Sequence, residues 1–206
     1  MKSSKIVNHN HEDMPNSMGR YSESYVHLAT NRLIFMNEVF TKNVAAELSS
    51  LMLYYDHVSE KENISLFIHS PGGDAAGLTQ IYDVMQMIKA PVQTICLGKA
   101  YSAGAVLLAA GSKGKRFMMK NARVMIHGLQ CGFPVPGDSI GESEIYLKYL
   151  EDYNQTVMKI LADHTGHTVA KISEDCTKDV WLDSKQALEY NLVDHILEDF
   201  SQLFPE

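Results

Sequence analysis

One serine stands at the entrance to a run of small apolar residues, in the stretch KAYSAGAVLLAAG at residues 99–111. The pattern predicts that a helix begins at Ser102, where unpaired backbone N–H groups and the helix dipole favour negative charge. Two interpretations are open for this hydroxyl. It could cap the helix, or it could be a nucleophile placed at the helix N-terminus.

A second stretch, SPGGDAAG at residues 70–77, contains the paired glycines Gly72 and Gly73. Glycines without side chains let backbone N–H groups approach a ligand closely, although a tight turn alone also explains them. An acyl-transfer enzyme needs a nucleophile together with donors aimed at the oxygen that becomes negative. The G-x-S-x-G nucleophile elbow is absent, because Ala100 occupies the position of its first glycine.

A nucleophilic serine also needs a base and a carboxylate that orients the base. Of the nine histidines, His127 ends the apolar stretch RVMIHG, so we expect its ring to reach the same edge of the sheet as Ser102. A structural histidine is the alternative. The candidate carboxylates in the last quarter of the chain are Asp175, Asp179, Asp183 and Asp194. Spacing alone does not choose among these four.

Metal and disulfide sites are not expected. His164 and His167 in DHTGH have the spacing of a metal pair, but they straddle a predicted helix end, where capping is the preferred interpretation. The three cysteines are an odd number without paired spacing, which is typical of a reducing compartment. Cys96 lies in an apolar stretch and is expected to be a buried, inert thiol. We therefore predict no metal and no cofactor.

The elements that must position these residues follow from hydrophobic periodicity. Strands are predicted at 32–36, 64–70, 92–98, 115–119, 123–128 and 192–197, and helices at 42–56, 78–88, from Ser102 onward, 142–164 and 184–190. Alternating strands and helices predict an α/β fold with a largely parallel sheet. The loops at the carboxyl ends of its strands would then bring the glycine pair and Ser102 together.

The long helix at 142–164 has an apolar stripe that could pack on the sheet of a monomer or on a neighbouring subunit. The sequence leaves both open.

Bulk composition excludes some classes of protein. With 206 residues, a single domain at 21–206 is expected, preceded by a flexible tail at 1–20 that has no apolar core of a signal peptide. A formal net charge of -7 without a Lys/Arg cluster argues against nucleic-acid binding. No apolar run approaches the roughly 20 residues of a membrane span. A cytoplasmic protein is the resulting expectation.

Two segments carry a family resemblance: FIHSPGGDAAGLTQIYDVMQMIKAPVQTICLGKAYSAGAVLLAAGSKGKRFMMKNARVMIH and HTGHTVAKISEDCTKDVWLDSKQALEYNLVDHIL. They resemble the proteolytic subunits of the Clp protease, which are self-compartmentalised serine peptidases. The resemblance implies that Ser102 is the nucleophile, His127 the general base and Asp179 the orienting carboxylate. It also implies an oxyanion hole made by the backbone N–H groups of Gly73 and Ala103.

The same resemblance implies a crotonase-like βαβ spiral with a long protruding helix. Family members form two stacked seven-membered rings, with that helix at the contact between rings, and degrade unfolded polypeptides delivered by an AAA+ unfoldase. This chain contains no G-x-x-x-x-G-K loop followed by Ser or Thr, so ATP hydrolysis is expected of the partner only.

Departures from the family pattern keep other hypotheses open. Tyr101 stands where the family usually has alanine and is expected to crowd the site or reshape a substrate pocket. The loop at 128–141 contains Pro134 and Pro136 and is expected to alter the strand that pairs with substrate. The altered loop, together with an N-terminal tail that lacks the family's usual apolar start, motivates a second hypothesis, a divergent subunit working in a mixed ring with a paralogue. A third is an acyl-CoA hydratase or isomerase of the same fold, in which a Ser/His pair would have no task.

Overall fold

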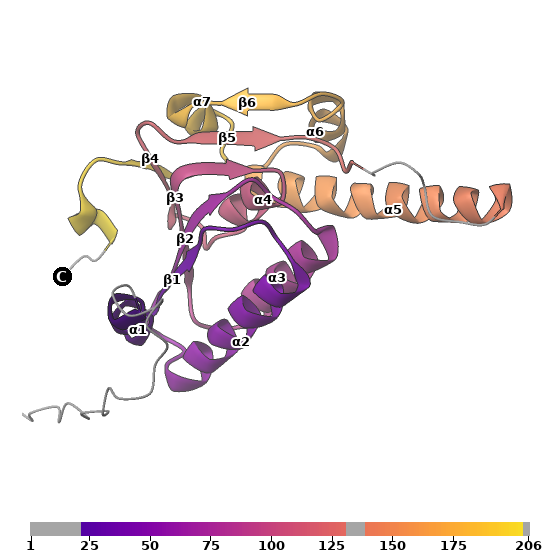
Figure 1. Cartoon of the computed structure of the whole chain (residues 1–206). Coiled ribbons are helices and arrows are strands. Elements are labelled where there is room, and N and C mark those ends of the chain that lie inside the picture. Colours follow the sequence, from indigo (N-terminus) through magenta and orange to yellow (C-terminus); the bar gives the residue numbers. More distant parts are fainter. Residues whose placement is uncertain (1–21, 131–138, 204–206) are drawn as a thin grey trace, which may run out of the picture.

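The computed structural model describes residues 22–130 and 139–203 (Figure 1). The predicted tail at 1–20 and residues 131–138 of the predicted loop lie outside the described residues. The helices are α1 (Ser22–Thr30), α2 (Lys42–Val58), α3 (Ala75–Met87), α4 (Ala103–Ala109), α5 (Ile140–Thr165), α6 (Val169–Asp175) and α7 (Ser184–Glu189). The strands are β1 (Leu33–Met36), β2 (Ile64–Ser70), β3 (Val92–Tyr101), β4 (Arg116–Met119), β5 (Arg123–Ile126), β6 (Val180–Leu182) and β7 (His195–Leu197), followed by the 3-10 turn η1 (Phe200–Leu203).

The strands form one mixed sheet in the order β1-β2-β3-β4-β7, with β5 paired to the end of β3 and β6 paired to β5. Every strand pair is parallel except β5–β6, which is antiparallel. The prediction of an α/β fold with a largely parallel sheet is confirmed.

The central strand, β3, changes neighbours along its length. Residues 94–96 pair with β4, whereas residues 99–101 pair with β5. This second pairing carries β3 three residues beyond the predicted end at residue 98. Gly98 and Lys99 give that segment no apolar pattern, so its strand character is not visible locally. It comes from pairing with β5 and, at Ala100, with Ser70 of β2.

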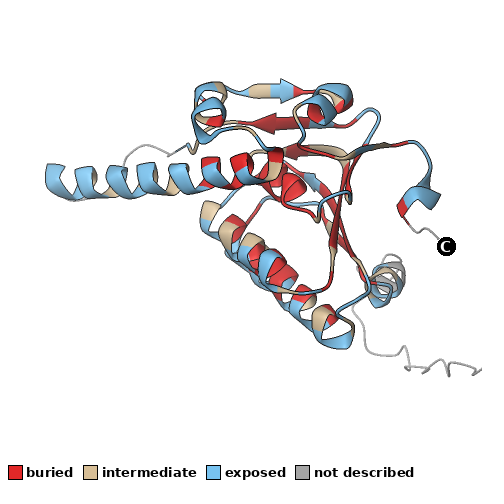
Figure 2. Cartoon of the chain, turned by 180° about the vertical axis from the view of Figure 1, so that it is seen from behind, coloured by how far each residue is buried: buried red, intermediate tan, exposed pale blue. Residues whose placement is uncertain are grey.

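Apolar side chains cover both faces of the sheet. On β2, Leu66 and Ile68 belong to the larger core, together with buried residues of α2, α3 and α4. Phe67 points to the opposite face and packs in a smaller core that includes Leu203 of η1. Figure 2 shows the buried strands in the centre, with α2 and α3 side by side against one face.

The helix α5 contains the predicted helix at 142–164 and behaves differently at its two ends. Its last turns bury Met158 and Leu161 in the main core. Its first turns extend beyond the rest of the molecule (Figure 2), where Ile140 is 81% and Ile145 72% exposed. Among residues 22–130 and 139–203, packing therefore covers only the C-terminal half of the apolar stripe.

Four short elements, α1, α6, β6 and η1, were not predicted, and the last strand begins at His195 rather than at residue 192. Of these, β6 is a three-residue strand within the polar stretch TKDVWLDS and forms only by pairing with β5. Within the described residues, no helix combines the length and apolar character needed to cross a membrane.

Candidate active site

Ser102 lies at the junction between β3 and α4. Its backbone has φ 54° and ψ −121°, a conformation that strains a residue other than glycine. The junction is fixed by the backbone N–H of Ser102, which donates to the carbonyl of Met125 at 2.7 Å. Although Ser102 occupies the N-cap position, its side chain makes no capping hydrogen bond. The capping interpretation of the hydroxyl is therefore wrong.

The hydroxyl is paired with an imidazole instead. His127 follows β5, and its Nε2 lies 2.8 Å from Ser102 Oγ. The prediction that these two residues reach the same edge of the sheet is confirmed. A serine in this arrangement can pass its proton to the ring as it attacks an electrophile.

The backbone after His127 is anchored from two sides. The N–H of Gly128 donates to the carbonyl of Cys176 at 2.9 Å, and the N–H of Leu129 donates to Asn154 Oδ1 at 2.7 Å. In the sequence, Asn154 carries little signal of this role, since it is one amide residue near the apolar stripe of α5.

Three of the four candidate aspartates have other partners. Asp175 accepts a hydrogen bond of 2.6 Å from the hydroxyl of Tyr190, and Asp183 caps α7. Asp194 forms an ion pair of 2.7 Å with the buried guanidinium of Arg116. Each of these three carboxylates therefore has a structural role away from His127.

The fourth, Asp179, faces His127. Its Oδ1 lies 3.4 Å from His127 Nδ1, and its side chain is 45% exposed, against 13% for the histidine. The pair is within ion-pair distance, but its geometry is not that of a hydrogen bond. Within the described residues, the buried Nδ1 has no hydrogen-bond partner. The carboxylate is thus on the correct side of the ring but loosely placed.

The glycine loop is bound to Phe40 by a short parallel bridge. The N–H of Phe40 donates to Gly72 O, and the N–H of Asp74 donates to Phe40 O, each at 2.9 Å. In this pattern Phe40 bonds the residues on either side of Gly73, so the N–H of Gly73 itself points away from Phe40. Gly72 has φ 93°, and a Cβ there would lie 2.7 Å from the Cβ of Ser102. The loop and the serine are in close contact.

A cavity of about 360 Å³ opens beside these groups and is lined by Gly73, Ser102, Ala103 and His127. Ala103 is the first residue of α4, where a backbone N–H has no partner within the helix. The remaining walls of this cavity are mostly apolar and include Leu78, Val106, Met125, Leu129 and Val157.

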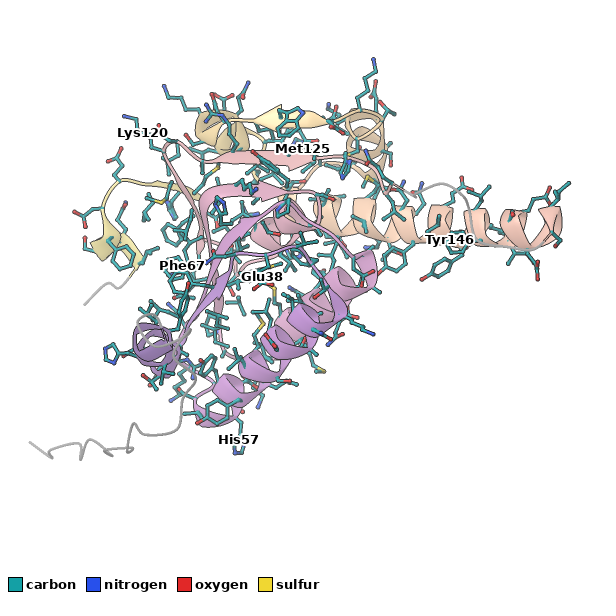
Figure 3. All side chains as sticks on the ribbon, viewed as in Figure 1. Glu38, His57, Phe67, Lys120, Met125 and Tyr146 are labelled. Carbon is teal, nitrogen blue, oxygen red and sulfur yellow. The ribbon has the colours of Figure 1, made fainter. Side chains whose placement is uncertain are left out.

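A second cavity of about 310 Å³ shares four lining residues with the first and continues along tyrosines of α5, among them Tyr146 (Figure 3). Tyr101 lines neither cavity, because its ring packs against Trp181. The expectation that Tyr101 crowds the site or reshapes a substrate pocket is therefore wrong.

The other chemistry-bearing residues have structural surroundings. His164 and His167 flank Gly166, which ends α5 in the left-handed conformation with φ 79°. In the part of the chain that the structure describes, no cluster of His, Cys, Asp or Glu could hold a metal ion. Cys96 is buried as predicted, and burial raises the pKa of its thiol to about 12.

Comparison with known proteins agrees with this geometry. The family model described as Clp protease matches residues 16–200. The chain belongs to the Clp protease family. A curated relative, the ATP-dependent Clp protease proteolytic subunit 1 of Bifidobacterium longum (strain NCC 2705), is 39% identical over 178 residues, which cover 85% of this chain and 75% of that protein. As a Clp protease family member, the chain is a proteolytic subunit with peptidase activity.

Proposed function

We propose that this Clp protease family chain cleaves peptide bonds with a triad of Ser102, His127 and Asp179, through an acyl-enzyme. The observation that carries the proposal is the 2.8 Å contact between Ser102 Oγ and His127 Nε2. The hydroxyl is neither used as a cap nor turned toward solvent, so the strained backbone at Ser102 serves to present it to the imidazole.

In the first half of the reaction, Ser102 Oγ attacks the carbonyl carbon of the scissile bond while His127 Nε2 takes the hydroxyl proton. The carbonyl oxygen becomes negative and accepts hydrogen bonds from the N–H groups of Gly73 and Ala103, which line the same cavity. The C–N bond then breaks, and His127 returns the proton to the leaving amine. Water, activated by the same imidazole, releases the acyl group in the second half.

Asp179 stabilises the imidazolium that forms in both halves. For this, its carboxylate must accept a hydrogen bond from Nδ1–H, so the 3.4 Å separation must shorten when substrate is bound. An exposed carboxylate next to a short strand can make that movement at little cost.

The substrate is an unfolded polypeptide. The two adjoining cavities, of about 360 and 310 Å³, suit an extended chain rather than a folded surface. Such a substrate must be supplied by an unfolding partner, and we assign this role to an AAA+ unfoldase. We further propose that residues 21–206 form one crotonase-like peptidase domain, assembled as two stacked seven-membered rings. The exposed apolar residues at the start of α5, including Ile140 and Ile145, favour this helix as the contact between rings.

The alternatives make different demands on the site. An acyl-CoA hydratase or isomerase would use the glycine loop to stabilise a thioester enolate, and the Ser102–His127 hydrogen bond favours peptide cleavage over that chemistry. A divergent subunit in a mixed ring would use the same triad but would need a paralogue for activity.

The proposal is tested by cleavage of a fluorogenic peptide by the purified, assembled protein. We expect hydrolysis that Ser102→Ala abolishes, with Ser112→Ala as a matched control for loss of a serine hydroxyl outside the site. Hydrolysis that survives Ser102→Ala contradicts the proposal. Hydrolysis that appears only on mixing with a paralogue supports the mixed ring instead.

A further inference from the structure

An aromatic pair crosses the sheet next to the candidate site. In the register of the sheet, Tyr101 of β3 lies opposite Met125 of β5, and Met125 lies opposite Trp181 of β6. The three strands run side by side at the upper edge of the molecule (Figure 1), with Met125 on the middle strand (Figure 3). Residues opposite one another in adjacent strands point to the same face. The two aromatic rings therefore lie on one face, on either side of the methionine.

The two aromatic rings are in contact with each other. Their centroids are 5.0 Å apart and their planes are inclined at 76°, the edge-to-face arrangement that aromatic pairs prefer. Lys99 Nζ, two residues earlier on β3, lies 5.9 Å from the centroid of the Tyr101 ring. Trp181 is 54% exposed, so about half of its surface is not stabilised by burial. Its edge-to-face contact with Tyr101 is a specific interaction that fixes the position of the indole.

The strand that carries Trp181 needs such a contact. β6 has three residues and, within the described residues, pairs only with β5. Strands this short contribute little stability of their own. A side-chain contact that reaches past β5 to β3 ties β6 to the centre of the sheet.

Both ends of the pair adjoin residues of the proposed triad. Tyr101 directly precedes Ser102, and Asp179 directly precedes β6, two residues before Trp181. The weakest contact of the site is the one between Asp179 and His127, at 3.4 Å. The position of β6 decides whether that contact can close.

We propose that Tyr101 and Trp181 are positioning residues, whose edge-to-face contact holds β6 so that the Asp179 carboxylate stays within reach of His127 Nδ1. This inference rests on the proposed function, because it assigns the pair a role in the same site. It also gives the unusual Tyr101 a purpose outside the substrate cavity.

The first test replaces Trp181 in the assembled protein. We expect Trp181→Ala to lower kcat for a fluorogenic peptide by about 2- to 10-fold, with KM unchanged, and Trp181→Phe to restore most of the rate. Phe200→Ala is the matched control, because Phe200 is a similarly exposed aromatic residue that stacks on Phe67, away from the site. Equal losses in Trp181→Ala and Phe200→Ala contradict the proposal. If Trp181→Ala no longer assembles into the oligomeric ring, the proposal is also contradicted, since Trp181 would then be needed for assembly.

A double-mutant cycle tests the route of the effect. If Trp181 acts through the carboxylate, Trp181→Ala has no further effect on kcat once Asp179→Asn is present. If the two losses multiply, Trp181 acts independently of Asp179 and the proposal is wrong.

Trp181 also supplies its own spectroscopic signal, because it is the only tryptophan in the chain. We expect Tyr101→Ala to move its fluorescence to longer wavelength and to lower kcat by the same factor as Trp181→Ala, whereas Tyr101→Phe changes neither. An unchanged emission in Tyr101→Ala contradicts the contact. Absence of any Ser102-dependent hydrolysis in the wild type refutes the proposed function separately, since the fluorescence shift does not require activity.

Discussion

Ser102 and Asp179 approach the same imidazole from the two edges of β5, and very different amounts of structure hold them. Ser102 lies between the end of the central strand, β3, and the start of α4, whose seven residues are all buried. Asp179 precedes a three-residue strand and is 45% exposed. The distances to the ring follow this difference, at 2.8 Å for the serine and 3.4 Å for the aspartate.

The comparison shows where this site is preorganised. Strain at Ser102 is tolerated because a buried helix and a strand pairing over-determine its backbone. Asp179 has no comparable support, so its geometry can respond to substrate or to changes at its own edge of the sheet. The proposed nucleophile and base are therefore fixed in the resting chain, whereas the proposed orienting carboxylate is adjustable.

Replacing the base has the largest expected effect. His127→Ala removes the proton acceptor of Ser102, and we expect kcat/KM to fall by about 10⁵- to 10⁶-fold. The measurement is peptide hydrolysis by the assembled protein. His195→Ala is the matched control, because that histidine is exposed and bonds the carbonyl of Gly114. A loss below 100-fold would show that another group accepts the proton.

Replacing the carboxylate has a smaller effect. Asp179→Asn leaves Ser102 and His127 in contact, so we expect kcat/KM to fall by about 10³- to 10⁴-fold, at least tenfold less than for His127→Ala. The same assay compares Asp179→Asn with Asp183→Asn, which alters only the cap of α7. Equal losses in the Asp179 and His127 variants would contradict the difference between the two regions.

Disturbing the support of the serine comes next. In Gly72→Ala, the new Cβ would meet the Cβ of Ser102 at 2.7 Å, and we expect a loss of roughly 100-fold in kcat/KM. Gly166→Ala is the control: its φ is also positive, at 79°, but no atom lies within 4 Å of the added Cβ. Gly166→Ala should lose about 1 kcal/mol of stability, measured by denaturant unfolding, because of its positive φ alone. Gly72→Ala should lose more, because its Cβ would also meet Ser102 and the carbonyl of Tyr101, and only Gly72→Ala should lose activity. Equal activity in the two variants would contradict a role of the glycine loop in positioning Ser102.

The smallest effect on activity is expected at Asp194, which supports β4 and β7. Burial alone would raise the pKa of Asp194, but hydrogen bonds from Arg116 outweigh it and hold the pKa below its usual range. A carboxyl group whose pKa is lowered by folding contributes stability above its unfolded pKa, and this contribution is lost as the pH falls through the folded value. Asp194→Asn should thus cost about 3 kcal/mol at pH 7 and flatten the acid loss of stability below about pH 4.

Denaturant unfolding between pH 3 and about pH 7 measures this effect, with kcat at pH 7 unchanged in the folded protein. A wild type and an Asp194→Asn variant with the same dependence on pH would contradict the role assigned to the ion pair.

The same division between the two regions explains what the sequence could predict. Ser102 and His127 follow local patterns, a small-residue helix and an apolar strand, and a parallel sheet brings the ends of such elements together. Asp179 follows no local pattern, because β6 exists only through its pairing with β5, and spacing left four aspartates open. The family resemblance selected Asp179, and the structure places it beside His127. Tyr101 was misjudged for the same reason: its partner, Trp181, lies on that unpredicted strand.

The reactivity of one hydroxyl, that of Ser102, is the central claim about this site. The assembled protein should be treated with a fluorophosphonate and digested, and the modified residue identified by mass spectrometry. We expect a single adduct on Ser102 that is absent from His127→Ala. An assembled wild type that takes no label, or that takes it on another residue, would contradict this claim.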